Sequence, residues 1–247
     1  MMLRAAIAVA AWSSIVMACG DDAHAPAPVC AALQLGVWSP RSQCGPSLDF
    51  TPINAYHGDA IADVQVREDA VALINGTCTG TLIAAAAGPV VLTAGHCVAL
   101  GDSPLVVFNF EDDPDGDPLV TSGTVIERAA APDYALIDLD ALPAVTPTPL
   151  TTRPSARVAI IQHPRGRPKQ IAVGDMRDAC DARMIANDVD TDVGSSGAGV
   201  LTESGALLGV HTDGECAADG SGANLGWTAA AILAVSSYLQ PADLVDR

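Results

Sequence analysis

Aromatic and basic residues are scarce in this chain of 247 residues. Aromatic side chains make up 4% of the sequence although 49% of it is apolar, so a core must be built mainly from Ala, Val, Leu and Ile. That apolar content argues against disorder throughout the chain. Lys and Arg number 12 against 29 Asp and Glu, and the formal charge is −17. Proteins that bind nucleic acid cluster their basic residues against phosphates, so we expect no nucleic-acid partner.

The N-terminus has no apolar run long enough to span a bilayer comfortably. Arg4 is followed by the apolar stretch Ala5–Ala18, a pattern typical of an export signal over residues 1–18. Val16-Met17-Ala18-Cys19 resembles the lipobox of bacterial lipoproteins, in which the cysteine is acylated and becomes the new N-terminus. We therefore expect an exported protein, held by lipid on Cys19 to the outer or cytoplasmic membrane of a bacterial cell envelope. The alternative is an ordinary signal peptide and a secreted protein.

Pairs of cysteines at C-x-x-C spacing and clusters of His and Cys at ligand spacing are absent, which argues against a zinc site. Apart from Cys19 the chain has six cysteines, an even number that suits disulfides in an oxidising compartment. Their order along the chain favours three pairs: Cys78–Cys97, Cys180–Cys216 and Cys30–Cys44. The pairing of Cys30 and Cys44 is the least determined of the three.

Composition divides the chain into four parts. Residues 1–18 form the signal peptide, and residues 19–59, rich in Pro, Ala, Ser and Gly, form an anchor and linker. The Pro-rich connector Leu142–Pro154 then separates a first β-domain at 60–142 from a second at 143–247. From Ala60 onward short apolar runs alternate with Gly, Pro and Asp, which is typical of β-sandwiches and β-barrels.

Ten of these runs are expected to be strands: Ala70–Asn75, Thr79–Ala84, Pro89–Ala94, Leu105–Phe110, Thr121–Glu127, Ala135–Leu139, Val158–Gln162, Gln170–Gly174, Gly199–Leu201 and Leu207–His211. The last stretch, Trp227–Leu239, differs because it lacks Gly and Pro. It places Ile232, Val235 and Leu239 along one helical face, so it predicts a C-terminal helix.

A histidine ends one of the apolar runs, in Val91-Leu-Thr-Ala-Gly-His96-Cys97. A His at a strand end beside a cysteine is well placed to act as a rigidly held general base. The string resembles the histidine motif of the chymotrypsin-like serine peptidases. In that family the cysteine bonds back to the preceding strand, and Cys78 occupies the corresponding position here. A histidine with only a structural role is the alternative.

An aspartate and a serine complete the pattern. Asp133 precedes the apolar run Tyr134–Leu139 and matches the acid of the family's catalytic triad, whereas Asp138 and Asp140 are expected to face solvent. Gly194-Ser195-Ser196-Gly197 matches the nucleophile motif G-x-S-G. The resemblance therefore makes Ser196 the nucleophile and the N–H groups of Gly194 and Ser196 the oxyanion hole.

The order His, Asp, Ser is that of chymotrypsin-like enzymes, not that of subtilisins or α/β-hydrolases. The resemblance implies an all-β protein with two Greek-key six-stranded β-barrels and a C-terminal α-helix. It covers about residues 70–239. Ser195 departs from the pattern, because it replaces the aspartate that animal trypsins use to bind a freed N-terminal amine.

The stretch His163-Pro-Arg-Gly-Arg-Pro-Lys169 is similar to a segment in the second barrel of many bacterial members, with a basic surface loop as the alternative reading of His163. His57 and Asp102 lie outside the motifs and are expected at the surface. The acidic run Glu111–Asp117 lacks the spacing of an EF-hand, so calcium there is a minor alternative.

The substrate-binding residues point in two directions. Asp190 matches the aspartate with which trypsins bind Lys or Arg by charge pairing. Thr191 and His211 match the residues with which glutamyl endopeptidases hold a substrate carboxylate. We favour cleavage after acidic residues because Thr191 and His211 agree with each other, although Asp190 would repel an acidic side chain if it faced the pocket.

The function implied is hydrolysis of peptide bonds in proteins or peptides by a serine endopeptidase, through an acyl-enzyme. No cofactor and no metal are expected, and the membrane contact is the lipid anchor only. We expect a monomer. The alternatives are trypsin-like cleavage after Lys or Arg and a catalytically silent surface binding protein of the same fold.

Overall fold

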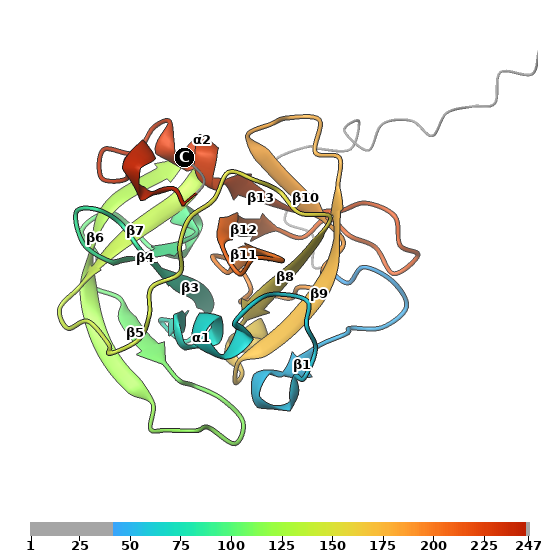
Figure 1. Cartoon of the computed structure of the whole chain (residues 1–247), viewed down its shortest axis with the longest axis horizontal. Coiled ribbons are helices and arrows are strands. Elements are labelled where there is room, and N and C mark those ends of the chain that lie inside the picture. The colour runs from blue at the N-terminus through green and yellow to red at the C-terminus, as the bar shows by residue number, and fades with distance from the viewer. Residues whose placement is uncertain (1–41, 246–247) are drawn as a thin grey trace, which may run out of the picture.

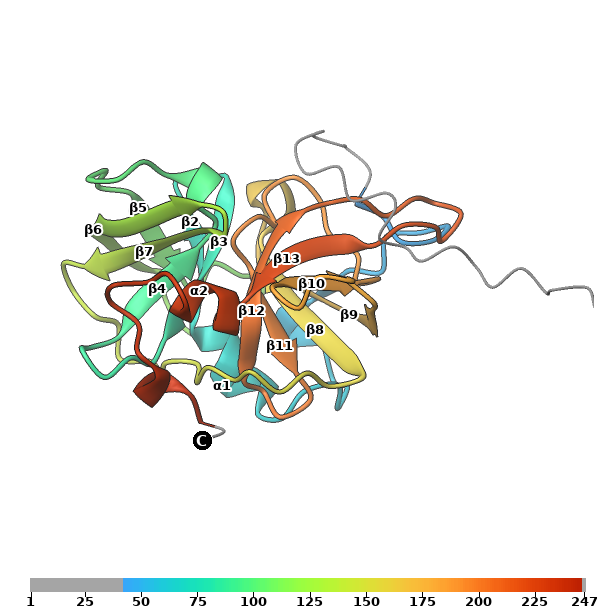
Figure 2. The same ribbon diagram turned by 90° about the horizontal axis from the view of Figure 1, so that it is seen from above.

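A first closed barrel is built from six antiparallel strands. The computed structural model describes residues 42–245. The first barrel lies beside a second one (Figures 1 and 2). The strands of the first barrel are β2 (Val71–Ile74), β3 (Cys78–Ile83), β4 (Val90–Thr93), β5 (Leu105–Phe108), β6 (Leu119–Ala130) and β7 (Asp133–Leu139). They close in the order β2-β3-β4-β7-β6-β5.

The second barrel also has six antiparallel strands. They are β8 (Arg157–Gln162), β9 (Gln170–Arg177), β10 (Met184–Asn187), β11 (Gly199–Thr202), β12 (Leu207–Asp213) and β13 (Asn224–Thr228). Their order is β9-β10-β13-β12-β11-β8, and the pairing of β8 with β9 closes the ring. The expectation of two six-stranded barrels is confirmed.

Several strands are apolar on both faces, which explains their continuous apolar runs. In β4, Val91 packs inside the first barrel, while Val90 and Leu92 belong to a cluster shared between the barrels. In β8, Ile160 lies inside the second barrel, and Ile161 faces the shared cluster. The shared cluster holds the two barrels together, and the functional residues lie along the same junction.

The C-terminal helix is shorter than the sequence predicts. Trp227 and Thr228 belong to β13, and helix α2 covers only Ala229–Leu233. The Thr228 hydroxyl accepts a hydrogen bond from Ala231 N and so caps the helix at its start. Beyond the helix, the carboxylate of Glu127 accepts hydrogen bonds from the Ser236 and Ser237 hydroxyls. The prediction was wrong in extent because strand pairing and this carboxylate override helical periodicity.

The remaining elements are short. They are strand β1 (Thr51–Pro52), helix α1 (Val64–Asp69) and the 3₁₀ turns η2 (Ile53–Ala55), η3 (Gly95–Cys97), η4 (Pro164–Gly166) and η5 (Pro241–Asp243). Within residues 42–245 no helix has the length and apolar character needed to cross a membrane.

Part of the expected linker is folded. Strand β1 pairs with β9 of the second barrel, and Ile53 is only 1% exposed within the shared cluster. Strand β1 therefore extends the sheet of the second barrel, and the expectation of a spacer up to residue 59 is wrong for this part of the chain. The proposed signal peptide, Cys19 and Cys30 lie outside the described residues.

The disulfides confirm one expected pair and overturn the others. Cys78 is bonded to Cys97, as expected, which ties β3 to the turn that carries His96. Cys44 is bonded to Cys216, so the expected pairs Cys30–Cys44 and Cys180–Cys216 are wrong. Residues 42–49 lie against the loop after β12, where Gly45 N donates to Ala217 O (3.2 Å). Order along the chain does not reveal that proximity. Cys180 is disulfide-bonded as well.

The chain's only lysine joins the barrels in a buried ion cluster. Lys169 is 0% exposed, and its Nζ donates to the carboxylates of Glu68, in α1, and Glu111, after β5. Asn54 Nδ2 donates to the second oxygen of Glu111 (2.9 Å). Because Glu111 already pairs with Lys169 and Asn54, the first acidic residue of the run Glu111–Asp117 is not free to bind calcium.

Candidate active site

The turn that carries His96 is held from two sides. His96 lies in η3 directly after β4, and the Cys78–Cys97 disulfide closes that turn from one side. From the other side Arg128 Nε, in β6, donates to the carbonyls of Gly95 (2.6 Å) and Val98 (2.9 Å). The arginine was not identified from the sequence, because its spacing from His96 marks no motif. These contacts fix the backbone from which the imidazole projects.

Asp133 orients the imidazole. Its Oδ1 accepts from His96 N (3.0 Å), and its Oδ2 lies 2.6 Å from His96 Nδ1. Nε2 has no partner among residues 42–245. The hydrogen bond to Asp133 raises the pKa of His96 above its ordinary 6.5, although burial opposes this shift. Asp138 and Asp140 are exposed, as expected for the solvent face of β7 and its end.

Ser196 lies in a tight turn before β11. Gly194 and Gly197 have φ values of 97° and 87°, a left-handed backbone that favours glycine. Ser195 is buried, its N donates to Asp192 O (2.9 Å), and its Oγ accepts from Asp192 N (3.0 Å). Ser195 therefore stabilises the turn locally, in the position where animal trypsins have aspartate.

Thr79 of β3 connects this turn to the first barrel. Its N donates to Ser196 O (2.9 Å), and its Oγ1 donates to Gly194 O (2.8 Å). The same hydroxyl accepts from His163 N (3.0 Å). Thr79 was missed in the sequence, where a threonine in a short strand-like run marks no motif; only the structure shows that it is fully buried.

Two backbone N–H groups beside Ser196 are unused. Val193 O accepts from Arg165 N (2.5 Å), and in a trans peptide the carbonyl and the following N–H point to opposite sides. The N–H of Gly194 is thereby directed away from Arg165. Neither this N–H nor that of Ser196 has an acceptor within the described residues, so both are available to a ligand oxygen.

His163 is buried rather than part of an exposed loop, which corrects that reading. It is 0% exposed, and its Nδ1 lies 2.9 Å from Arg167 O. Burial lowers the pKa of His163 to about 4. Together with Arg165, whose guanidinium pairs with Asp192 (2.6 Å), the His163–Lys169 stretch supports the serine turn from behind.

A cavity of about 530 Å³ collects the candidate residues at the junction of the barrels. It is lined by His96 and Asp133 from the first barrel and by Gly194, Ser196 and His211 from the second. The ligand atoms of Cys78, His96 and Cys97 lie within 4.8 Å of one another, but both sulfur atoms belong to the disulfide and offer no thiolate to a metal. His57 and Asp102 are exposed and lie outside the cavity, as expected.

The residues expected to bind substrate do not all lie at the cavity. His211, in β12, is 3% exposed and lines the cavity, and burial together with the nearby His96 lowers its pKa to about 4. The His211 Nδ1 and the Thr191 Oγ1 are buried without a partner in the described part of the chain. Thr191 is 1% exposed and, unlike His211, does not line the cavity. Asp190 does not line the cavity, and both its carboxylate oxygens accept backbone hydrogen bonds of 2.6 Å, from Cys44 N and Asp49 N. This corrects the expectation that Asp190 faces the substrate.

Comparison with known families decides the identity of this arrangement. The family of the trypsin-like peptidase domain matches residues 78–210, which is 133 of the 247 residues and includes His96, Asp133 and Ser196. The chain belongs to the trypsin-like peptidase family. It is accordingly a serine endopeptidase, and its substrates are proteins or peptides.

Solved structures share the fold of this trypsin-like peptidase. A serine endoprotease from Yersinia pestis is 15% identical with a TM-score of 0.55, over 70% of this chain and 63% of that one. The Rv3671c protease of Mycobacterium tuberculosis, in an inactive form, is 22% identical with a TM-score of 0.54, over 69% and 89%. A Glu endopeptidase is 20% identical with a TM-score of 0.56, over 75% and 93%. No curated protein matches the chain in sequence.

Proposed function

We propose that the protein cleaves peptide bonds with His96, Asp133 and Ser196 as a catalytic triad. The observation that carries the proposal is the cavity at the barrel junction. There an imidazole oriented by Asp133 and the serine of a G-x-S-G turn open onto the same space as two unused N–H groups. These are the parts that acyl transfer to a serine requires.

In this mechanism His96 Nε2 takes the proton of Ser196 Oγ while the oxygen attacks the substrate carbonyl carbon. The N–H groups of Gly194 and Ser196 donate to the oxyanion, and Asp133 stabilises the imidazolium. His96 then gives the proton to the leaving amine. A water molecule, activated by the same imidazole, hydrolyses the acyl-enzyme and restores the serine.

A fluorophosphonate probe tests this proposal because it reacts only with an activated serine. We expect mass spectrometry to locate the label on Ser196 in the wild-type protein and no label in Ser196→Ala. The adjacent Ser195→Ala is the matched control and should still be labelled, since Ser195 Oγ is buried in its bond to Asp192. A folded wild-type protein without label would refute the triad and favour a silent binding protein.

We further propose that the enzyme prefers an acidic residue before the cleaved bond. Two buried polar atoms lack partners within the described residues: His211 Nδ1, on a residue that lines the cavity, and Thr191 Oγ1, on a residue whose N–H is bonded to the cavity residue Ser42. A substrate carboxylate that enters the cavity would supply the missing partners. A hydrogen bond to the backbone of Leu225 favours a proton on the other ring nitrogen, so His211 binds the carboxylate after taking up a second proton. Because Asp190 is already hydrogen-bonded to the backbone, it does not oppose this preference. The likeness of the fold to a Glu endopeptidase agrees with it.

Thr191→Val tests this preference without changing side-chain volume much. We expect kcat/KM for a peptide with Glu before the cut to fall on the order of tenfold, the value of one hydrogen bond to a charged group. The fall should occur mainly through KM, and the matched peptide with Ala should be cleaved as before. Equal losses for both peptides would contradict a carboxylate-binding role.

We also infer export and lipid attachment at Cys19, from the lipobox-like Val16–Cys19. Disulfides persist in oxidising compartments, so Cys44–Cys216 and Cys78–Cys97 support an exported protein. Metabolic labelling with a palmitate analogue should mark the wild-type protein and not Cys19→Ser. A label retained in Cys19→Ser would overturn this inference.

A further inference from the structure

We propose that Ser42–Asp49, called here the leading segment, is a specificity element that forms one wall of the substrate cavity and keeps Asp190 away from the substrate. The proposal rests on the proposed function, since it assigns the cavity beside Ser196 to the side chain that precedes the cut bond. The leading segment precedes both barrels in the chain and belongs to no sequence motif described above.

The first observation is the position of Ser42. It lines the cavity that contains His96, Ser196 and His211, and it is 8% exposed. A Cβ on Gly214, which also lines the cavity, would collide with the Ser42 side chain, so these two residues are in close contact. Ser42 therefore limits the space available to a bound side chain.

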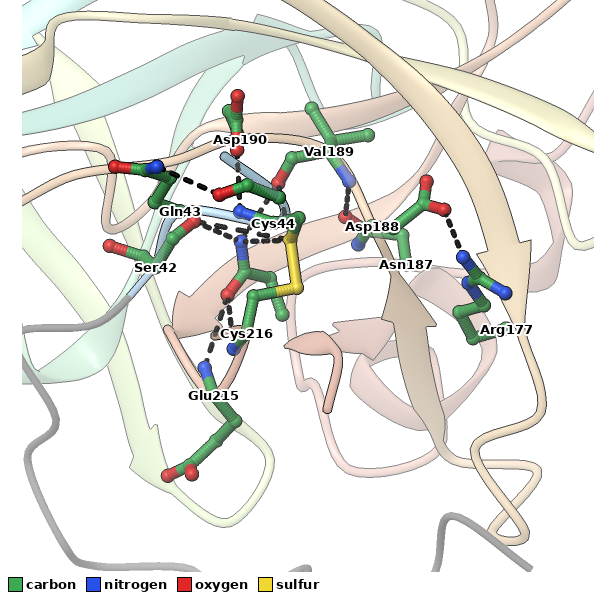
Figure 3. The surroundings of a disulfide bond; sticks show 12 residues. Ser42, Gln43, Cys44, Arg177, Asn187, Asp188, Val189, Asp190, Glu215 and Cys216 are labelled. Atoms are coloured by element: carbon green, nitrogen blue, oxygen red, sulfur yellow. Dashed lines mark hydrogen bonds and ion pairs between the residues drawn. A yellow bond between two sulfur atoms is a disulfide. The ribbon is translucent and has the colours of Figure 1, made fainter. Parts of the chain in front are cut away.

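The second observation is that the backbone of Ser42 is hydrogen-bonded to the second barrel. Its carbonyl accepts hydrogen bonds from Thr191 N (3.1 Å) and from Asn224 Nδ2 (2.8 Å). Asn224 Nδ2 also donates to Val189 O (2.8 Å), which joins the leading segment to the strand region before the serine turn. Figure 3 shows Ser42 beside Val189 and the disulfide.

The third observation concerns the charge of the pocket. Asp190 is 4% exposed, and its two carboxylate oxygens each accept a 2.6 Å bond, from Cys44 N and Asp49 N (Figure 3 shows the bond to Cys44). Its own carbonyl accepts from Gln162 Nε2 (2.8 Å). The backbone of the leading segment thus provides the partners that a buried carboxylate requires. A substrate with Lys or Arg therefore cannot pair with Asp190, although Asp213 and Glu215 line the same cavity.

The fourth observation is covalent. The Cys44–Cys216 disulfide attaches the leading segment to the loop after β12 (Figure 3). That loop carries the cavity residues Gly214 and Glu215. Glu215 N and Cys216 N both donate to Asn224 Oδ1, so the same asparagine holds the loop and the segment. Disulfide, asparagine and aspartate together make the wall a rigid part of the site.

The consequence is a specificity set by a segment remote in sequence. With the leading segment in place, the cavity presents His211 and excludes Asp190. With the segment released, the Asp190 carboxylate loses both backbone donors and becomes an anion that pairs with a basic substrate residue. The same chain would then tolerate Lys or Arg before the cut.

The test uses the full-length protein and three peptides that differ only in the residue before the cut: Glu, Lys or Ala. In Cys44→Ala/Cys216→Ala we expect the ratio of kcat/KM for Lys over Glu to rise at least about tenfold, as when a pocket contact changes. Ser42→Leu, which keeps the disulfide, should raise KM for the Glu peptide about tenfold and leave KM for the Ala peptide unchanged. Ser103→Leu, an exposed serine on the first barrel, is the matched control and should change neither value.

Fluorophosphonate labelling of Ser196 in every variant separates this proposal from the proposed function. Labelled variants whose Glu, Lys and Ala ratios all stay within about twofold of wild type would overturn the role of the leading segment. A wild-type protein that is neither labelled nor active would instead refute the proposed function on which this role rests. If the double variant does not fold, Ser42→Leu decides the question, because it leaves the disulfide and Asp190 unchanged.

Discussion

Replacing Lys169 by methionine should destabilise the protein strongly. The Lys169 Nζ donates to the Glu68 carbonyl (2.7 Å), to the Glu68 carboxylate and to Glu111 Oε1 (2.5 Å), and the three side chains are at most 1% exposed. Methionine fills a similar volume but leaves two buried carboxyl groups without their cation. Breaking a buried ion pair in this way costs about 3–5 kcal/mol.

The size of the expected change in Tm follows from the length of the folded part. For domains of 150–250 residues 1 kcal/mol shifts Tm by about 2–4 °C, so Lys169→Met should lower Tm by roughly 6–20 °C at pH 7. Circular dichroism during heating measures it. The deficit should be smaller at pH 5, where protonation of Glu111 removes the charge that Lys169→Met leaves without a cation.

The control for this experiment is Arg183→Met, which removes an exposed ion pair with Asp181 and should leave Tm unchanged. A Tm change below about 3 °C in Lys169→Met at pH 7 would refute this reasoning about a buried cluster.

The stability of the wild-type protein should also depend on pH. Burial raises the pKa of Glu68 from 4.5 to about 8, so the native state holds a proton that the unfolded state releases. The contribution of Glu68 to the free energy of unfolding therefore falls as pH rises from 4.5 to 8.

Three further predictions concern catalysis. Asp133→Asn should lower kcat on the order of 10,000-fold with little change in KM, because the imidazole loses the tautomer that Asp133 selects; a loss below about tenfold in steady-state assays would contradict the triad. Because Asp133 raises the pKa of His96 and the base must be neutral, kcat/KM should rise with pH to a plateau with a midpoint above 6.5, and a midpoint below 6.5 would exclude His96 as the base. Gly197→Ala should lower the free energy of unfolding measured in urea by about 1–3 kcal/mol, because φ at this position is 87° and the new Cβ would collide with Thr79 O. It should also abolish labelling by the fluorophosphonate probe. A variant as stable as the wild type would contradict this prediction.

Local patterns predicted most of the strands and the candidate site. All ten expected runs contain a strand, and alternation placed Asp138 on the solvent face of β7. The pattern failed at β10 and β13, which are four and five residues long. In β13 the apolar run is interrupted by Asn224, which is polar, and by Gly226, which has no side chain. Only the pairing with β10 and β12 therefore reveals the strand.

Contacts between distant segments lay beyond the sequence. The Cys44–Cys216 bond joins residues 172 positions apart, and order along the chain favoured nearer partners. His163 and Lys169 belong to a stretch with basic residues and were open to interpretation as a surface loop, whereas both are 0% exposed. Their burial depends on Thr79, Glu68 and Glu111, which come from the other barrel or its flanking helix.

The sequence by itself determined the family, the strand pattern and the order of His96, Asp133 and Ser196, because these depend on short strings whose chemistry is local. The tertiary structure alone decided which of the candidate specificity residues lines the cavity. Asp190 and His211 occupy equally suggestive positions in the sequence, yet the backbone of Ser42–Asp49 covers one and leaves the other beside the cavity. The physical reason is that burying a carboxylate requires hydrogen-bond donors, and a chain can bring them from any distance along its length.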